Sequence, residues 1–139
     1  MFLYDLRPMS ASDTPKPHNE WRTAPIDRAE DAAYTFGYHL IKHCRAEALK
    51  AVQSSAVPTS AEEMRVQVEK AVDTALHNVM DLLEGFWRTE AGAGQRVEYV
   101  LSVCVKDAHG DEIVERIDIS PCMLDLPIGY WKWKDGEFR

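Results

Sequence analysis

Cysteine is scarce in this sequence, and its three copies form no recognisable pattern. Cys44, Cys104 and Cys122 are an odd set in dissimilar surroundings. A secreted protein held together by disulfide bonds carries an even and denser set. We therefore expect reduced thiols in a cytoplasmic protein, serving as small buried apolar residues. The alternative is a reactive thiol, either Cys104 near His109 or Cys122 near another histidine, but the sequence brings no base clearly close to either.

Long apolar runs are also missing. No segment approaches the roughly 18 consecutive apolar residues of a membrane-spanning helix. The opening residues, MFLYDLRPMS, have too short an apolar run for a signal peptide and no basic residues before it. The last residues carry no lipidation motif. These absences predict a cytoplasmic protein of bacterial style with no membrane partner.

Positive charge is in deficit. The chain has 16 lysines and arginines against 23 acidic residues, which gives a formal net charge of −7. Binding to a nucleic-acid backbone needs clustered positive charge, so we expect no nucleic-acid partner. The negative charge is compatible with a basic protein partner, although it also serves solubility.

The familiar catalytic and cofactor motifs are absent as well. The sequence contains no phosphate-binding loop, dinucleotide fingerprint, G-x-S-x-G elbow or zinc-finger spacing. The segment AGAG at 91–94 lacks the strand-to-helix context that a phosphate loop requires. We therefore expect no cofactor and favour a protein that is not an enzyme.

The 139 residues, of which 45% are hydrophobic, suit a single globular domain. Residues 1–25 are predicted to be an irregular N-terminal arm, because prolines and the polar stretch SASDTPKPHNE interrupt any helix. Residues 26–139 are predicted to form one α+β domain. The prolines of the arm are Pro8, Pro15, Pro17 and Pro25.

Residues 26–54 have the periodicity of an amphipathic helix. Asp27 is the expected N-cap, and Glu30 stands at the capping-box position three residues later. Small residues on this helix would let a second helix approach closely, which leaves a homodimeric structural protein as one alternative. They are Ala29, Ala33, Gly37 and Ala48, while the apolar arc contains Ala29, Ala33, Phe36, Leu40, Cys44 and Ala51.

A second helix is predicted from Ser60 to about Glu84. Ser60 and Glu63 form a capping box, and Gly85 fits a left-handed C-terminal cap. The loop between the two helices is short, so we expect them to form an antiparallel hairpin. The apolar arc of the second helix contains Ala61, Val68, Val72, Ala75, Leu76, Val79, Met80 and Leu83.

Beyond the loop TEAGAGQ the period of the pattern changes to two, which predicts strands. Residues 97–106 form the first, and residues 112–120 return after the turn DAHGD, in which Gly110 is expected to be left-handed. Ile113, Ile117 and Ile119 are expected on one face of the returning strand. The outward and inward residues of the first strand alternate, with Val97, Tyr99, Leu101, Val103 and Val105 on its apolar face.

The segment GYWKWKD again alternates with a period of two and predicts a third strand. Trp131 and Trp133 would then point into the core, and the lysines between them to solvent. The alternative is an exposed aromatic and basic surface for a partner. The expected fold is thus α+β, a two-helix antiparallel hairpin packed on a short antiparallel sheet of about three strands.

Three histidines are candidates for a metal site. His39 and His43 are four residues apart on one helix face, and in an antiparallel hairpin His77 would lie level with His39. A small metal-dependent or ligand-binding enzyme built on them is therefore an alternative. Since His77 projects away from the apolar arc of its helix, we expect no bound metal, and a hydrogen bond from His43 to Glu47 instead.

Asp73, His77, Asp81 and Glu84 are spaced by four, four and three residues, so they share one face of the second helix. They are the predicted partner-binding residues. We expect this face to be exposed and either merely solvated or used to dock a basic protein. The leading hypothesis is a non-enzymatic binding protein, an inhibitor or immunity-type protein that uses this acidic face.

Overall fold

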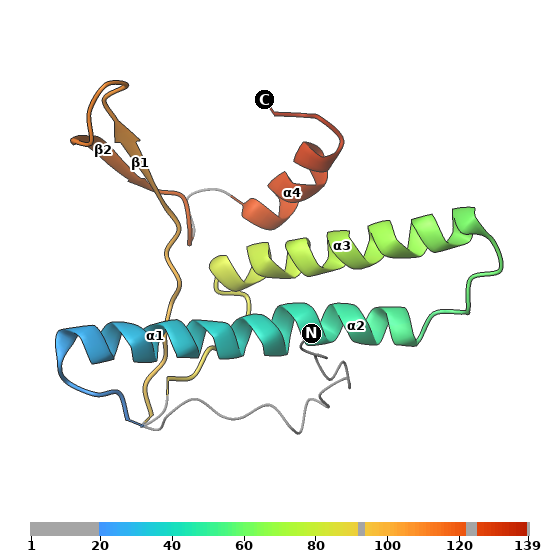
Figure 1. Ribbon diagram of the computed structural model, residues 1–139, viewed down its shortest axis with the longest axis horizontal. Helices are drawn as coiled ribbons and strands as arrows, with labels where there is room; N and C mark the ends of the chain where they lie inside the picture. The colour runs from blue at the N-terminus through green and yellow to red at the C-terminus, as the bar shows by residue number, and fades with distance from the viewer. Residues whose placement is uncertain (1–19, 92–93, 122–124, 139) are drawn as a thin grey trace, which may run out of the picture.

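The computed structural model describes residues 20–91, 94–121 and 125–138. They form an α+β structure with a long helical region, two further helices and a two-stranded antiparallel sheet (Figure 1). The helices are α1 (Pro25–His39), α2 (Ala46–Gln53), α3 (Ala61–Leu83) and α4 (Leu126–Lys134), and the strands are β1 (Ser102–Lys106) and β2 (Ile113–Asp118). A π-helical segment, η1 (Leu40–Arg45), joins α1 to α2 without a break, so the three form one long helix.

The long helix begins at Pro25, and its N-cap is Ala24, which has no side-chain cap hydrogen bond. Proline at the first helical position has the backbone angle that a helix start requires. The predicted capping box of Asp27 and Glu30 is therefore wrong. Both carboxylates lie in the first turns and form ion pairs with Arg22 instead.

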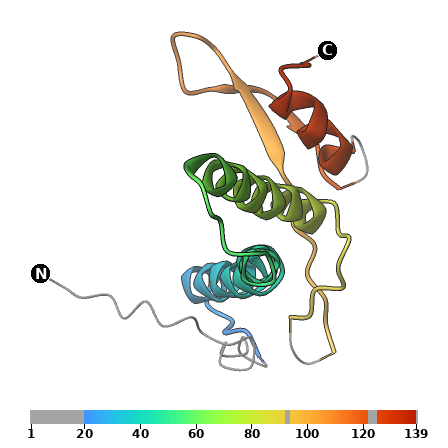
Figure 2. The same ribbon diagram turned by 90° about the vertical axis from the view of Figure 1, so that its right-hand side faces the viewer.

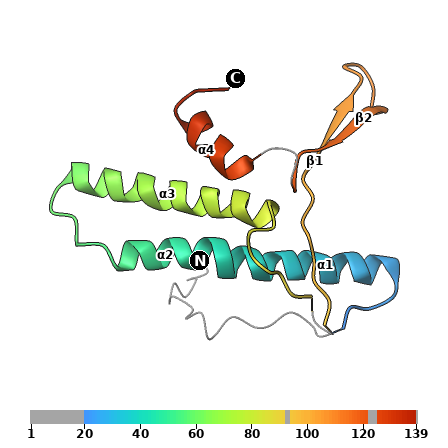
Figure 3. The same ribbon diagram turned by 180° about the vertical axis from the view of Figure 1, so that it is seen from behind.

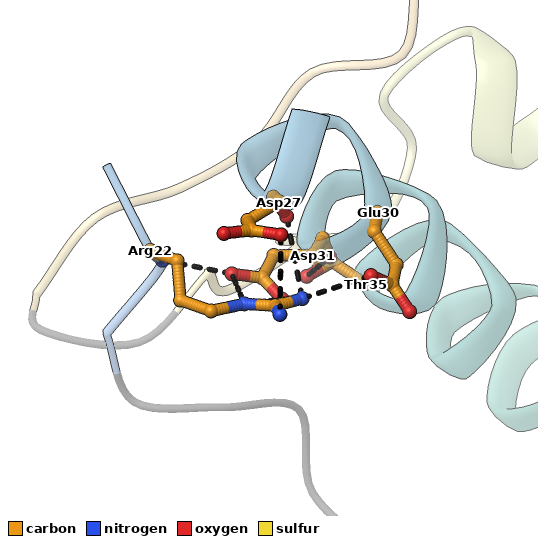
Figure 4. Close-up of polar contacts among 5 residues, drawn as sticks. All are labelled: Arg22, Asp27, Glu30, Asp31 and Thr35. Atoms are coloured by element: carbon orange, nitrogen blue, oxygen red, sulfur yellow. Dashed lines mark hydrogen bonds and ion pairs between the residues drawn. The ribbon is translucent and has the colours of Figure 1, made fainter. Parts of the chain in front are cut away.

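Arg22 holds the chain that precedes α1 against the first turns of this helix (Figure 4). One terminal nitrogen of its guanidinium lies 2.8 Å from Asp31 Oδ1, and its backbone N–H donates to Asp31 Oδ2 at 2.7 Å. The Asp31 side chain is only 1% exposed, so these bonds replace water around a buried charge. The hydrogen bond with Asp31 is the main cause of a raised pKa at Arg22.

The buried face of α1 is polar, which the predicted arc did not anticipate. Asp31, Thr35 and His39 are buried, whereas Ala29 and Ala33 are exposed. The π-helical turn follows directly, and its wider i→i+5 spacing places residues five apart on the same side. The next buried residues are therefore Cys44 and Ala48.

Helix α3 begins and ends at the predicted caps, although the Glu63 carboxylate accepts from the Thr59 N–H and not from that of Ser60. Ser60 Oγ accepts a hydrogen bond from the Glu63 backbone N–H at 3.1 Å. Gly85 has a φ of +73°, and the Phe86 N–H donates to the Asp81 carbonyl at 3.0 Å, the pairing of a Schellman cap. From its cap, α3 returns along η1 and α2, and it lies between the long helix and α4 (Figures 1 and 2).

The sheet has two strands, where about three were predicted, and it does not pack on the helices. Strand β1 pairs with β2 from Ser102↔Asp118 to Lys106↔Ile113. A bulge beside Lys106 moves Ile113 out of phase with Ile117, so the expected isoleucine face is not formed. Every residue of β2 is exposed, and the ribbon stands away from the helical pair (Figure 3).

Two details of this ribbon also differ from the sequence analysis. The turn forms around Asp107, whose Oδ1 accepts from the His109 N–H at 3.0 Å, and Gly110 is not left-handed. The first half of the predicted strand, residues 97–101, is not a strand. It crosses the long helix, where Tyr99 packs against Phe36 with ring centroids 5.0 Å apart.

The predicted third strand is helix α4, and this is the largest correction. Asp125 caps it by accepting from the Ile128 N–H at 3.3 Å, and Pro127 occupies its first turn. Both are helix-start signals, and they precede residues 130–134, whose alternation predicted a strand. Trp131 and Trp133 do not close a core, since they remain 43% and 37% exposed.

The buried apolar core is small. Across the ranges that the structure describes, five apolar residues are buried, and only Leu82 and Leu126 among them are large; the others are Cys44, Ala48 and Ala91. No helix in those ranges has the length and apolar character needed to cross a membrane. Of the predicted arm, residues 1–19 lie outside the described residues.

Candidate interaction surface

The acidic stripe, Asp73, His77, Asp81 and Glu84, lies on the side of α3 that faces α4. At one end, Asp73 accepts hydrogen bonds from the Tyr130 hydroxyl at 2.7 Å and from Lys134 Nζ at 3.0 Å. The bond from Tyr130 is the main cause of a lowered pKa at Asp73. Burial, followed by Asp73 itself, raises the pKa of Tyr130 to about 12.

The middle of the stripe packs against an aromatic ring of α4. The rings of His77 and Trp131 have centroids 5.1 Å apart, and His77 Nδ1 lies 3.5 Å from Asp81 Oδ2. Burial is the main cause of a raised pKa at Asp81. At the far end, Glu84 Oε1 accepts from the Leu126 backbone N–H at 3.4 Å.

The expectation that this stripe is exposed is therefore wrong. The side chains of Asp73 and Asp81 are 22% and 14% exposed, because the aromatic and basic residues of α4 cover them. The C-terminal segment that was read as a strand thus supplies the basic group that the stripe binds within the same chain. An external basic partner would have to displace α4.

The structure brings His39 and His43 together but places His77 in the separate cluster with α4. The rings of His39 and His43 are stacked with centroids 6.0 Å apart, and His43 stacks on Trp87 at 4.8 Å. His43 thus packs on an aromatic ring, while Glu47 pairs with Lys50. Within residues 20–91, 94–121 and 125–138, no three His, Cys, Asp or Glu side chains are grouped to hold a metal ion.

His39 is a buried, neutral residue. It is 3% exposed, and the Tyr99 hydroxyl lies 2.6 Å from its Nδ1. Burial is the main cause that lowers the pKa of His39 to about 4, with His43 and Lys42 adding to it. Burial likewise raises the pKa of Tyr99 to about 12. This pair links the long helix to the crossing segment and is shielded from any substrate in water.

The thiols do not form a reactive site in the part of the chain that is described. Cys44 is buried, and burial raises its pKa to about 11, which keeps it protonated. Cys104 is a free, exposed thiol on β1, so the expectation that it is buried is wrong. Cys122 lies outside the described residues.

An open apolar groove runs between the long helix and α3, with a volume of about 380 Å³. The residues that line it are mostly aliphatic, and the larger ones include Ile41, Leu49, Val72 and Leu76, which are 37% to 50% exposed. From the long helix they are Leu40, Ile41, Cys44, Arg45, Ala48 and Leu49. From α3 they are Ala71, Val72, Ala75, Leu76 and Val79.

The groove is the surface that the sequence analysis did not find. Four residues of the predicted apolar arc of α3 line the groove, but the arc omits Leu82, the buried residue of this helix, and was expected to contact the sheet. Since the sheet stands elsewhere, Val72 and Leu76 remain 50% and 44% exposed. The sequence signal that could have found the groove is this arc, since its members Val72, Ala75, Leu76 and Val79 line the groove.

Scans against protein-family models, curated proteins and solved structures each returned no match for this chain. Function is therefore inferred from the residues themselves.

Proposed function

We propose that this protein is a non-enzymatic binding module whose binding face is the groove between the long helix and α3. The observation that carries this proposal is the exposure of an apolar helix face that has no cover within the described residues. Apolar surface that is exposed as a group, and not as scattered single residues, marks interaction sites. A helix pair buries its apolar stripe against another layer.

The state of the titratable groups also supports binding over catalysis. His39 is buried against Tyr99, and His77 packs on Trp131 beside Asp81. A general base must reach the proton that it removes from a substrate, and its pKa should lie near the working pH. With a pKa of about 4 and 3% exposure, His39 meets neither condition.

Photo-crosslinking in the native host tests the proposed binding face. A photo-reactive amino acid at Val72, in the groove, is expected to crosslink to a protein. At Val66, on the same helix but outside the groove lining, it is expected to give little product. The two positions are a matched pair, because Val72 and Val66 are 50% and 52% exposed. Equal or absent crosslinking at both positions would contradict the proposal.

A second candidate is the inhibitor or immunity-type function, in which the acidic stripe binds a basic protein. The observation that favours it is that α4 already places an aromatic hydroxyl and a lysine on Asp73. In this proposal α4 occupies the site until a basic, aromatic helix of the partner replaces it.

A peptide with the sequence of residues 125–138 is a direct probe of this second candidate. We expect it to bind the full-length Tyr130→Phe, Lys134→Ala double variant about tenfold more tightly than the parent, because the variant has lost two contacts that hold α4 in place. Fluorescence anisotropy of a labelled peptide measures this, and Lys132→Ala is the control on the same helix. Equal affinity for all three proteins would exclude the stripe as an exchangeable site.

A cytoplasmic location is part of the proposal. It is supported by the exposed thiol of Cys104, since free exposed cysteines are typical of reducing compartments.

A further inference from the structure

We infer that the groove is covered by a second copy of this chain, so that two helix pairs meet face to face in a four-helix interface. This inference rests on the proposed function and names the partner of the same surface. In a two-fold dimer each copy presents the same patch, so the patch must complement itself in size, shape and charge.

The small core indicates a partner that is always present. Leu82 and Leu126 are the large apolar residues buried in the described part of the chain. A domain of this length normally buries a much larger apolar set, and obligate interfaces resemble such a core cut in half. A second copy is available wherever the chain is made, whereas a transient partner would leave the helix pair open for part of the time.

The shape of the groove allows it to pack against the same groove of a second chain. Its floor contains small residues, including Ala48 and Ala75, which are buried or half-buried. Larger side chains form its walls, including Val72 and Leu76 on α3 and Leu49 on the long helix. Side chains from the walls of one copy can enter the floor of the other, as ridges enter grooves in packed helices. The result has the layered arrangement of a four-helix bundle.

The lining of the groove is almost uncharged, which suits a patch that meets its own copy. Arg45 is the one charged residue in the lining, it is exposed, and it makes no ion pair within the described ranges. Because each copy has a net charge of −7, the two chains repel each other at long range, and a lining without carboxylates keeps acidic groups of the two copies from facing one another inside the interface.

Sedimentation equilibrium of the purified full-length chain tests this inference. The parent is expected to sediment as a dimer, at twice the 15.8 kDa of one chain, and to dissociate on dilution. Val72→Glu should raise the dimer dissociation constant at least about tenfold, because the two-fold axis buries the new carboxylate twice. Val66→Glu, equally exposed on another side of α3, should change it less than about twofold. Circular dichroism checks that both variants fold.

The other outcomes contradict the inference in distinguishable ways. A dimer that Val72→Glu does not weaken would use another surface, such as the ribbon of β1 and β2. A folded parent that stays monomeric up to about 100 µM would overturn the inference even if Val72→Glu failed to fold. In that case a crosslink from Val72 to a different protein would still support the proposed function. The lack of any crosslink would contradict both the proposed function and this inference.

Discussion

Leu126→Ala and Leu82→Ala are each expected to lower the free energy of unfolding by about 3 kcal/mol, within the usual range of 2–5 kcal/mol for buried leucines. Leu126 and Leu82 are 2% and 1% exposed, the most buried large apolar residues in the described part of the chain. Leu126 begins α4, and Leu82 lies in the last turn of α3, against which α4 packs. Where total stability is about 5–15 kcal/mol, either change should shift a urea unfolding curve strongly.

Ile128→Ala is the matched control, because Ile128 belongs to the same helix and is 57% exposed. We expect Ile128→Ala to lower the free energy of unfolding by less than about 1 kcal/mol. Trp133→Ala should fall between the two, since its ring packs against the backbone of Gly129, where an added Cβ would lie 2.5 Å from the ring. If Trp131→Ala and Trp133→Ala each lowered the free energy of unfolding by more than Leu126→Ala does, the result would favour the predicted strand and contradict helix α4.

Stability is expected to fall by up to about 3 kcal/mol as the pH is lowered from about 6.5 to about 4, because of His39. An unfolded histidine takes up its proton near pH 6.5, whereas the folded state holds the pKa of His39 at about 4, mainly through burial. Between these values the unfolded state binds more protons, so the stability present above pH 6.5 is lost on acidification. His43, whose pKa is also lowered mainly by burial, acts in the same direction.

Thermal unfolding of His39→Gln across this range isolates the effect. Glutamine retains hydrogen-bonding groups for Tyr99 but does not titrate, so the variant should lose much of the pH dependence, whatever its stability at pH 7. His109→Gln, in the exposed turn, should keep the dependence of the parent. If stability depended on pH equally in the parent, His39→Gln and His109→Gln, His39 would not be the group responsible.

The parts of the fold that the sequence predicted are those governed by neighbouring residues. Ser60 and Glu63 cap α3, and Gly85 ends it, because each acts within one turn of its own position. The long helix was located to within about one residue at each end. Its inward face was not, because the buried residues of α1 are the polar Asp31, Thr35 and His39, which a projection of apolar residues does not find.

The parts that could not be predicted depend on contacts between distant residues. An alternation of five residues does not distinguish a strand from a short helix, and in α4 the capping by Asp125 decides the outcome. The partner of Asp73 is Tyr130, 57 residues later, and that of His39 is Tyr99, 60 residues later. No local rule predicts such pairs, so the stripe was expected to be exposed and His39 to be a candidate ligand.

Carbene footprinting of the purified protein tests the central claim, that the groove is a covered interface, most directly. The labelling reagent modifies side chains in proportion to their exposure, and Val72 and Val66 are almost equally exposed in the single chain. At a concentration where the chain associates, Val72 should be labelled severalfold less than Val66, and dilution should remove the difference. Equal labelling of the two valines at every concentration would contradict the claim.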